Sequence, residues 1–113
     1  RIQYVLYPGL ENHPGYVINK AQTTGFGGMI SFAVDSAETA RQILEGVKLI
    51  KFSESLGGTE SLITYPIRQT HTDLTAEECA EKGITDCLLR FSTGIEATQD
   101  LIDDLAQAFA AVE

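Results

Sequence analysis

The chain has 113 residues, of which 43% are hydrophobic and 21% are charged, and this is the size and composition of one domain with a single apolar core. Its formal net charge of -8 argues against a nucleic-acid partner or an anionic membrane surface, because binding phosphate requires a basic surface. No apolar run reaches the length of about 20 residues that spans a bilayer. We therefore expect residues 1–113 to form one acidic, soluble domain.

Two features bear on the cellular setting and on completeness. Cys79 and Cys87 are too few for a disulfide framework, so we expect reduced thiols and a cytoplasmic location. The chain opens directly on a strand-like run and shows no signal peptide. Because it begins at Arg1 and not at Met, we expect it to be a piece of a longer protein.

Hydrophobic patterning in the first half predicts strands and helices in alternation. We expect a strand at 5–7, followed by a helix that Asn12 caps, with Pro14 in its first turn and Val17, Ile18 and Ala21 on one face. A strand at 29–34 comes next. A capping box of Asp35 and Glu38 then opens a helix with Ala40, Ile43, Leu44 and Val47 at helical spacing, and an extended segment follows at 47–52.

The second half continues in the same way. We expect a strand at 62–65 and then a short helix that begins with a capping box of Thr75 and Glu78 and stops at Gly83. A strand at 87–92 follows. The last element expected is a helix that Thr98 caps and that buries Leu101, Ile102, Leu105, Phe109 and Val112. Most connections are short. The fold class predicted is α/β of the α+β type, with a small, mainly antiparallel sheet and helices packed on one face.

Neither phosphate nor metal binding is supported by a motif. Gly25, Gly27 and Gly28 precede a strand, whereas a phosphate-binding loop precedes a helix whose N-terminus faces the anion. The histidines and cysteines show no C-x-x-C or H-x-x-x-H spacing, so we expect no metal site and no cysteine nucleophile.

Arg90 is the informative residue. In the strand at 87–92, alternation places Leu89 and Phe91 on one face and Arg90 on the other. A guanidinium in such a strand needs an anion, because burying it unpaired is costly. Two readings stay open: an internal ion pair with Glu54, Glu60 or Glu96, or a pocket for a ligand carboxylate, which the planar guanidinium binds through two hydrogen bonds.

A set of motifs, in order and over nearly the whole chain, resembles the C-terminal region of a known family. These motifs are Tyr-Pro-Gly-Leu at 7–10 with His-Pro at 13–14, Gly-Phe-Gly-Gly-Met at 25–29, Glu-Ser-Leu-Gly-Gly at 54–58 with Glu-Ser-Leu at 60–62, Thr-His at 70–71, and Leu-Arg-Phe-Ser-Thr-Gly-Ile-Glu at 89–96. The family is the pyridoxal-phosphate-dependent enzymes of cysteine and methionine metabolism, which includes cystathionine γ-synthase, cystathionine β- and γ-lyases and methionine γ-lyase.

The resemblance implies a substrate-binding role. The matching arginine, Arg90, would bind the α-carboxylate of the amino-acid substrate, with Ser55 beside it and Thr70 supporting the pocket. Clamping the carboxylate fixes which bond at Cα stands perpendicular to the cofactor ring. Glu54 resembles the synthase and γ-lyase branches, where an acid suits the cationic distal amino group of cystathionine; alternatively, it only caps its loop.

The resemblance also implies what this chain lacks. The catalytic lysine that holds pyridoxal phosphate belongs to a large domain that is absent, and none of Lys20, Lys48, Lys51 and Lys82 lies in the matching motif. We therefore expect no cofactor binding and no turnover by this chain alone. The implied partners are its own large domain, a sulfur amino-acid substrate and, at full length, the other subunits of a homotetramer.

The exact enzyme stays open at this point. Cystathionine γ-synthase or γ-lyase leads, and β-lyase or methionine γ-lyase is the alternative. From other classes, the chain could be a free-standing amino-acid-binding or regulatory module, or a pure interaction domain with an acidic surface.

Overall fold

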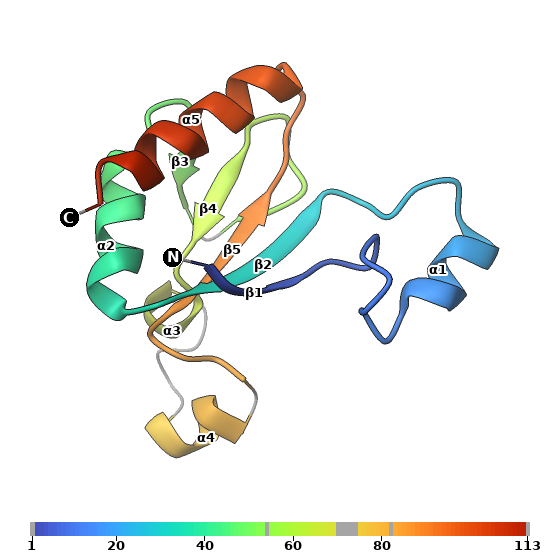
Figure 1. Cartoon of the computed structure of the whole chain (residues 1–113), viewed down its shortest axis with the longest axis horizontal. Helices are drawn as coiled ribbons and strands as arrows, with labels where there is room; N and C mark the ends of the chain where they lie inside the picture. The colour runs from blue at the N-terminus through green and yellow to red at the C-terminus, as the bar shows by residue number, and fades with distance from the viewer. Residues whose placement is uncertain (1, 54, 70–74, 82, 113) are drawn as a thin grey trace.

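A five-stranded sheet forms the centre of the computed structural model (Figure 1). The structure describes residues 2–53, 55–69, 75–81 and 83–112. The strands are β1 (Ile2–Leu6), β2 (Met29–Val34), β3 (Lys51–Phe52), β4 (Leu62–Thr64) and β5 (Leu88–Ser92), in the spatial order β1-β2-β5-β4-β3. Every neighbouring pair is antiparallel except β3 with β4, which is parallel. The predicted small, mainly antiparallel sheet is therefore confirmed.

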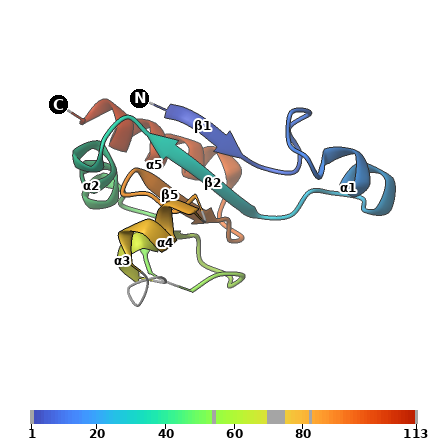
Figure 2. The ribbon, with the colours of Figure 1, turned by 90° about the horizontal axis from the view of Figure 1, so that it is seen from below.

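The two long helices pack together on one face of this sheet. The helices of the described residues are α1 (Tyr16–Gln22), α2 (Ala37–Gly46), α3 (Pro66–Gln69), α4 (Ala76–Glu81) and α5 (Thr98–Ala110). Figures 1 and 2 show α2 and α5 side by side over the sheet, with α3 and α4 at the other side. The short helix α3 adds a small second cluster there, in which Ile67 packs against Ile84 and Leu88.

The main core lies between the sheet and the pair α2–α5. Ile43 of α2, Ile63 of β4 and Leu89 of β5 are each 0% exposed, and burying one such side chain stabilises the fold by about 1.5–3 kcal/mol. The helices can approach each other because small residues meet between them: a Cβ on Gly46 would lie 3.4 Å from Cα of Ala108. The predicted burial of Ile102 in α5 is wrong: its side chain is 53% exposed, because it lines a groove that is open to solvent between α5 and the sheet.

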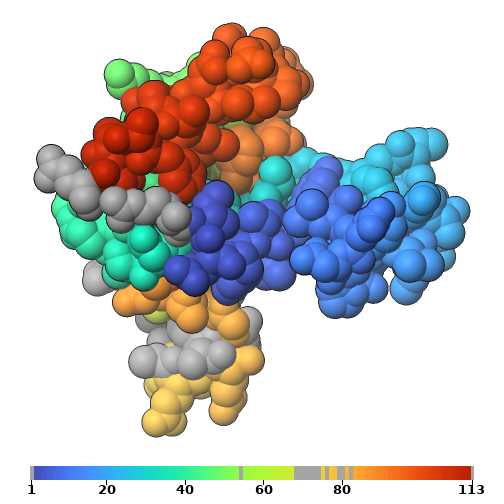
Figure 3. Space-filling model, in the orientation of Figure 1, coloured from blue at the N-terminus to red at the C-terminus, as the bar shows by residue number. Residues whose placement is uncertain are grey.

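Residues 7–28 form an arm between β1 and β2, and Figure 3 shows it projecting from the body of the domain. The ring of Phe26 stacks on that of Tyr16 with centroids 5.6 Å apart. The predicted cap at Asn12 is wrong, because α1 begins only at Tyr16. The residues before α1 form successive hydrogen-bonded turns, and the His13 ring accepts the N–H of Gly15 at 2.9 Å.

Two other predicted caps are shifted by one residue. Ser36, and not Asp35, caps α2, because its Oγ accepts the N–H of Thr39 at 3.1 Å. The N-cap of α5 is Ala97, which provides no side-chain hydrogen bond, so Thr98 is the first helical residue.

The predicted pairing of Thr75 with Glu78 at the start of α4 is confirmed in its first half, the cap by the Thr75 hydroxyl. The N–H of Glu78 donates to Oγ1 of Thr75 at 3.1 Å, and that hydroxyl donates to the Glu78 carboxylate at 3.2 Å. Gly83 follows the helix with a φ of 75°, a conformation that favours glycine.

Asp104 of α5 holds the segment that leads into β3. Its carboxylate accepts the backbone N–H groups of Lys48, Leu49 and Ile50 at 2.8, 2.9 and 2.8 Å, and the side chain is 6% exposed. Burial raises the pKa of this carboxyl, but the backbone hydrogen bonds, with one from Gln107, outweigh it and keep the pKa below its usual value. The backbone N–H groups of this segment therefore donate to a side-chain carboxylate and not to a neighbouring strand.

Replacing Asp104 by Asn should lower the free energy of unfolding by about 2 kcal/mol, because an amide cannot accept all three N–H groups. The contribution of Asp104 is complete above an unfolded-state pKa of about 3.9 and is lost as the pH falls through the lower folded-state pKa. Urea unfolding at pH 7 and at acid pH measures both effects.

Asp103→Asn is the matched control. Asp103 lies next to Asp104 but is exposed and accepts a hydrogen bond from Gln99 on the helix surface. Its replacement should change the free energy of unfolding by less than about 0.5 kcal/mol. Equal losses in the two variants would contradict the role given to Asp104.

Candidate functional site

Arg90 lies on the sheet face opposite the main core, as the alternation of β5 predicts. Leu89 and Phe91 point into the core beneath α2 and α5, and Leu88 points to the other face with Arg90. Since β5 is paired on both sides, Arg90 has a register partner on each: Ser31 of β2 and Thr64 of β4. Its side chain is half-buried and its Nε atom is fully buried.

Thr64 connects Arg90 to the start of the loop that carries Ser55. Nη2 of Arg90 lies 3.5 Å from Oγ1 of Thr64, and this hydroxyl donates to the carbonyl oxygen of Ser53. The N–H of Ser53 in turn donates to the carbonyl oxygen of Ile63 at 3.0 Å, continuing the parallel pairing of β3 with β4. The backbone that follows β3 therefore runs directly beside Thr64, the register partner of Arg90 on β4.

The glycine loop, which we define as residues 55–60, has a second attachment on β5. The N–H of Gly57 donates to Oγ of Ser92 at 3.0 Å. Ser92 is two residues beyond Arg90 on the same strand and therefore on the same face. The loop is thus anchored to the Arg90 face of the sheet shortly before and shortly after Ser55.

Ser61 and Glu96 fasten the far end of the glycine loop. The Glu96 carboxylate accepts the N–H of Ser61 at 2.8 Å and its hydroxyl at 2.7 Å, while the Ser61 oxygen accepts the N–H of Gly94 at 2.8 Å. The Ser61 carbonyl also accepts the N–H of Lys51 at 3.0 Å. Hydrogen bonds from the Ser61 N–H and hydroxyl lower the pKa of Glu96, so this carboxyl stays ionised at neutral pH.

Only glycine fits at position 94. A Cβ there would lie 2.4 Å from the carbonyl oxygen of Thr59 and 2.6 Å from the carbonyl carbon of Glu60. The turn after β5 and the end of the glycine loop are therefore in direct backbone contact. A backbone hydrogen bond of 2.9 Å from Ile95 to Thr59 closes this contact.

The structure brings together part of the predicted site. Arg90 and the loop containing Ser55 belong to one hydrogen-bonded assembly, and the Ser55 side chain is exposed to solvent. Glu54 and Thr70 lie outside the described residues, and their predicted roles remain predictions. Sequence reasoning did not assign a role to Thr64 or Ser92; the alternation that places Ser92 on the Arg90 face was the available signal.

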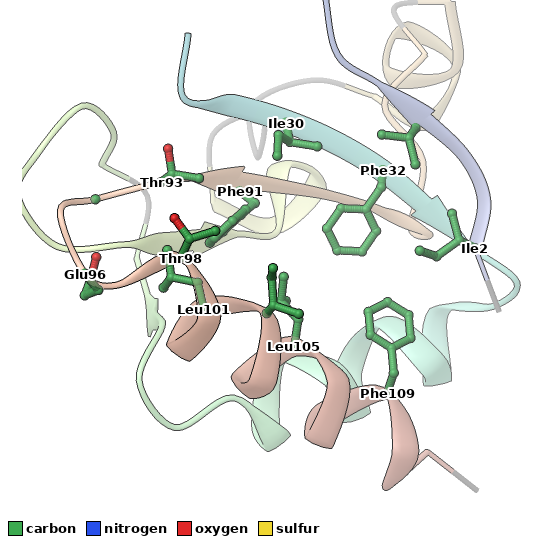
Figure 4. Close-up of a pocket in the computed structure, with 13 residues that line it drawn as sticks. Ile2, Ile30, Phe32, Phe91, Thr93, Glu96, Thr98, Leu101, Leu105 and Phe109 are labelled. Atoms are coloured by element: carbon green, nitrogen blue, oxygen red, sulfur yellow. The ribbon is translucent and has the colours of Figure 1, made fainter. Parts of the chain in front are cut away.

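An apolar groove of about 450 Å³ opens on the other face of the sheet, between α5 and the strands β1 and β2 (Figure 4). Phe32, Phe91 and Phe109 point into it, and its polar residues, Thr93, Glu96 and Thr98, gather at one end. A groove lined in this way suits apolar side chains better than a charged amino acid. Arg90 is absent from its lining, so the groove and the Arg90 site are separate.

Within the described residues, three lysines and two cavities bear on where a cofactor could be held. Lys20, Lys48 and Lys51 are exposed, and neither the apolar groove nor the cavity between α2 and Tyr65 has a lysine in its lining. Burial raises the pKa of the Cys87 thiol, which keeps it protonated and a poor nucleophile. Within the described part of the chain, no cluster of His, Cys, Asp and Glu could hold a metal ion, and no helix could span a membrane.

Comparison with known proteins decides the family. The model of the family described as Cys/Met metabolism PLP-dependent enzyme matches residues 1–110. The chain belongs to this family. The resemblance seen in the motifs is thereby confirmed, and with it pyridoxal phosphate as the cofactor of the full-length family enzymes.

Individual relatives agree with this assignment. A cystathionine gamma-lyase of Bacillus subtilis is 49% identical over 95% of this chain and 28% of its own length. An L-methionine gamma-lyase of Fusobacterium nucleatum is 44% identical over 99% of this chain and 29% of its own length. The crystal structure of cystathionine gamma-lyase from Lactobacillus plantarum complexed with L-serine superimposes with a TM-score of 0.91 at 38% identity, covering 98% of this chain and 29% of that one.

The matches differ in activity but agree in coverage. Others bear the names cystathionine beta-lyase and cystathionine gamma synthase. The chain spans less than a third of the length of these family members. The similarity is therefore to one part of each of these relatives.

The close contact at Gly94 gives a stability test. Gly94→Ala should lower the free energy of unfolding by about 2 kcal/mol, because the new methyl group would overlap backbone atoms of Thr59 and Glu60 that cannot rotate away. Thermal unfolding of both proteins measures the difference.

Gly25→Ala serves as the matched control, since a Cβ there meets nothing within 4 Å. It should leave stability unchanged or raise it by up to about 1 kcal/mol, because alanine restricts the unfolded chain. A Gly94→Ala protein as stable as Gly25→Ala would show that the contact between the two turns is not formed.

Proposed function

We propose that this chain is the C-terminal, substrate-carboxylate-binding domain of a pyridoxal-phosphate-dependent enzyme that eliminates or replaces a group at the β or γ carbon of sulfur amino acids. Cystathionine γ-synthase or γ-lyase is the activity we favour. The family membership supports the class of chemistry. The observation that carries the binding role is Arg90, a half-buried guanidinium on the sheet face that the long helices leave open.

Arg90 suits a carboxylate for physical reasons. A guanidinium offers donors in a rigid planar fork that matches the two oxygens of a carboxylate, and partial burial strengthens such hydrogen bonds. Its position on a strand paired on both sides holds the backbone fixed, which favours precise orientation of a bound group. A substrate held in this way keeps a fixed angle about its Cα.

Three further residues complete the proposed pocket. Ser55 offers a hydroxyl for the same carboxylate from a loop anchored to the Arg90 face. Thr70 supports the pocket, and Glu54 accepts the distal amino group of cystathionine; both roles rest on the motif matches at 54–58 and 70–71. Among these residues no group acts as the acid or base, so this chain contributes binding and orientation.

The cofactor and its lysine belong, in this proposal, to a large domain of the same polypeptide. Bound pyridoxal phosphate supplies the electron sink for bond breaking at Cα. The short coverage of the relatives supports a further domain, and the exposed lysines of this chain support its inability to bind the cofactor alone. We propose a homotetramer in the cytoplasm for the full-length enzyme.

A second activity within the family is supported by the relatives. A cystathionine beta-lyase and an L-methionine gamma-lyase match at 41% and 44% identity, close to the 49% of the cystathionine gamma-lyase of Bacillus subtilis. Assaying the full-length protein with cystathionine, with an O-acylhomoserine plus cysteine, and with methionine separates these activities by product. Binding of amino acids without turnover would instead favour a regulatory module.

Arg90→Ala in the full-length enzyme should lower kcat/KM by about 100-fold or more, since removing one partner of a hydrogen-bonded charge pair costs about 2–5 kcal/mol. Arg90→Lys should recover only part of the loss, because an ammonium keeps the charge without the planar fork. Steady-state kinetics with the best substrate of the panel measures both.

Arg41→Ala is the control for loss of a positive charge. Arg41 lies on the exposed side of α2 and pairs with Glu38 and Glu45 of the same helix. Its removal should leave kcat/KM within about twofold of the wild type. An Arg90→Ala enzyme with wild-type kcat/KM would refute the carboxylate-binding role.

A further inference from the structure

We propose that Ser92 is a positioning residue for the substrate carboxylate: it holds the glycine loop so that Ser55 stands at the guanidinium of Arg90. The inference rests on the proposed function, because it gives Ser92 a role in the same carboxylate site as Arg90 and Ser55. Ser92 reaches the substrate only through Gly57 and Ser55, so its effect on binding should depend on Ser55.

The geometry around Gly57 carries the inference. Gly57 has a φ of +74°, a left-handed conformation that a glycine adopts without strain, and its N–H is thereby directed to Oγ of Ser92 at 3.0 Å. Ser92 is 3% exposed, so water competes little for this hydrogen bond. The buried hydroxyl of Ser92 thus fixes the glycine loop to the sheet at Gly57.

The register of the sheet determines where the loop is held. Ser92 pairs with Leu62 and Arg90 with Thr64, two positions further along the same two strands. The loop is fixed to Ser92 through Gly57, and its approach from β3 is fixed to Thr64 through Ser53. In sequence, Ser55 therefore lies midway between two attached residues, Ser53 and Gly57, one held by the register partner of Arg90 and the other by the residue two positions after Arg90.

Thr64 is the second anchor. Thr64 is 1% exposed, and its hydroxyl donates to the Ser53 carbonyl and lies 3.5 Å from Nη2 of Arg90. Unlike Ser92, it contacts Arg90 directly, so its removal would affect Arg90 as well as the loop. For this reason Ser92 gives the cleaner test of positioning through Ser55.

The test compares two inhibitors of the full-length holoenzyme that differ only in the α-carboxylate: L-norvaline and its decarboxylated counterpart, butylamine. We define carboxylate discrimination as the inhibition constant of butylamine divided by that of L-norvaline. Arg90→Ala and Ser55→Ala should each lower this ratio. Ser92→Ala should lower it by about fivefold, the worth of one hydrogen bond, and by less than about twofold in a Ser55→Ala background.

Thr39→Val is the control for loss of a buried hydroxyl. Thr39 is 3% exposed and bonds Asp35 at the start of α2, so its replacement should leave the ratio unchanged. If Ser92→Ala lowers carboxylate discrimination equally with and without Ser55→Ala, or does not lower it at all, the inference is overturned. A lowered ratio in Arg90→Ala would still uphold the proposed function. An unchanged ratio in Arg90→Ala would overturn both.

Thr64→Val keeps the inference testable should Ser92→Ala not fold. Valine matches the shape of threonine and removes only the hydroxyl that holds Ser53 and contacts Arg90. It should lower carboxylate discrimination in the same direction as Ser92→Ala. An unchanged ratio in folded Thr64→Val enzyme would overturn the account of an anchored loop.

Discussion

The pairing of β5 with β2 on one side and β4 on the other is the constraint on which the rest of this domain depends. It buries Leu89 and Phe91 beneath the long helices and, by alternation, turns Arg90 to the opposite face. The same strand therefore contributes to the core with one face and presents Arg90 on the other. A shift of one residue in its register would place the guanidinium in the core, which the cost of burying an unpaired charge forbids.

The glycine loop and the residues beside it are held at three points, by β4, by β5 and by the turn that follows β5. Thr64 and Ser92 hold its beginning and middle, and the Ser61–Glu96 pair holds its end. The links of Gly57 to Ser92 and of Ser61 to Glu96 each join residues 35 apart in sequence, so these parts of the loop are held only when β4 and β5 are paired. An exposed loop made rigid in this way loses little further conformational entropy when it binds a ligand, which favours affinity and orientation.

Much of this could be predicted from local patterns, and the rest depended on distant contacts. The faces of β5, the Thr75 cap of α4 and the mainly antiparallel sheet followed from alternation and spacing. The start of α1 was missed because the His13 ring, and not Asn12, takes up a backbone N–H. The roles of Thr64, Ser92 and the Ser61–Glu96 pair were missed because side chains 26 to 35 residues apart meet only in the folded sheet.

The central claim is that Arg90 binds the α-carboxylate of an amino-acid substrate. The most direct test is a crystal structure of the full-length enzyme with a bound amino-acid inhibitor. The account predicts both carboxylate oxygens within about 2.7–3.2 Å of the Arg90 guanidinium nitrogens, with the Ser55 hydroxyl beside them. A carboxylate bound to another cation, with Arg90 turned to a protein carboxylate instead, would contradict it.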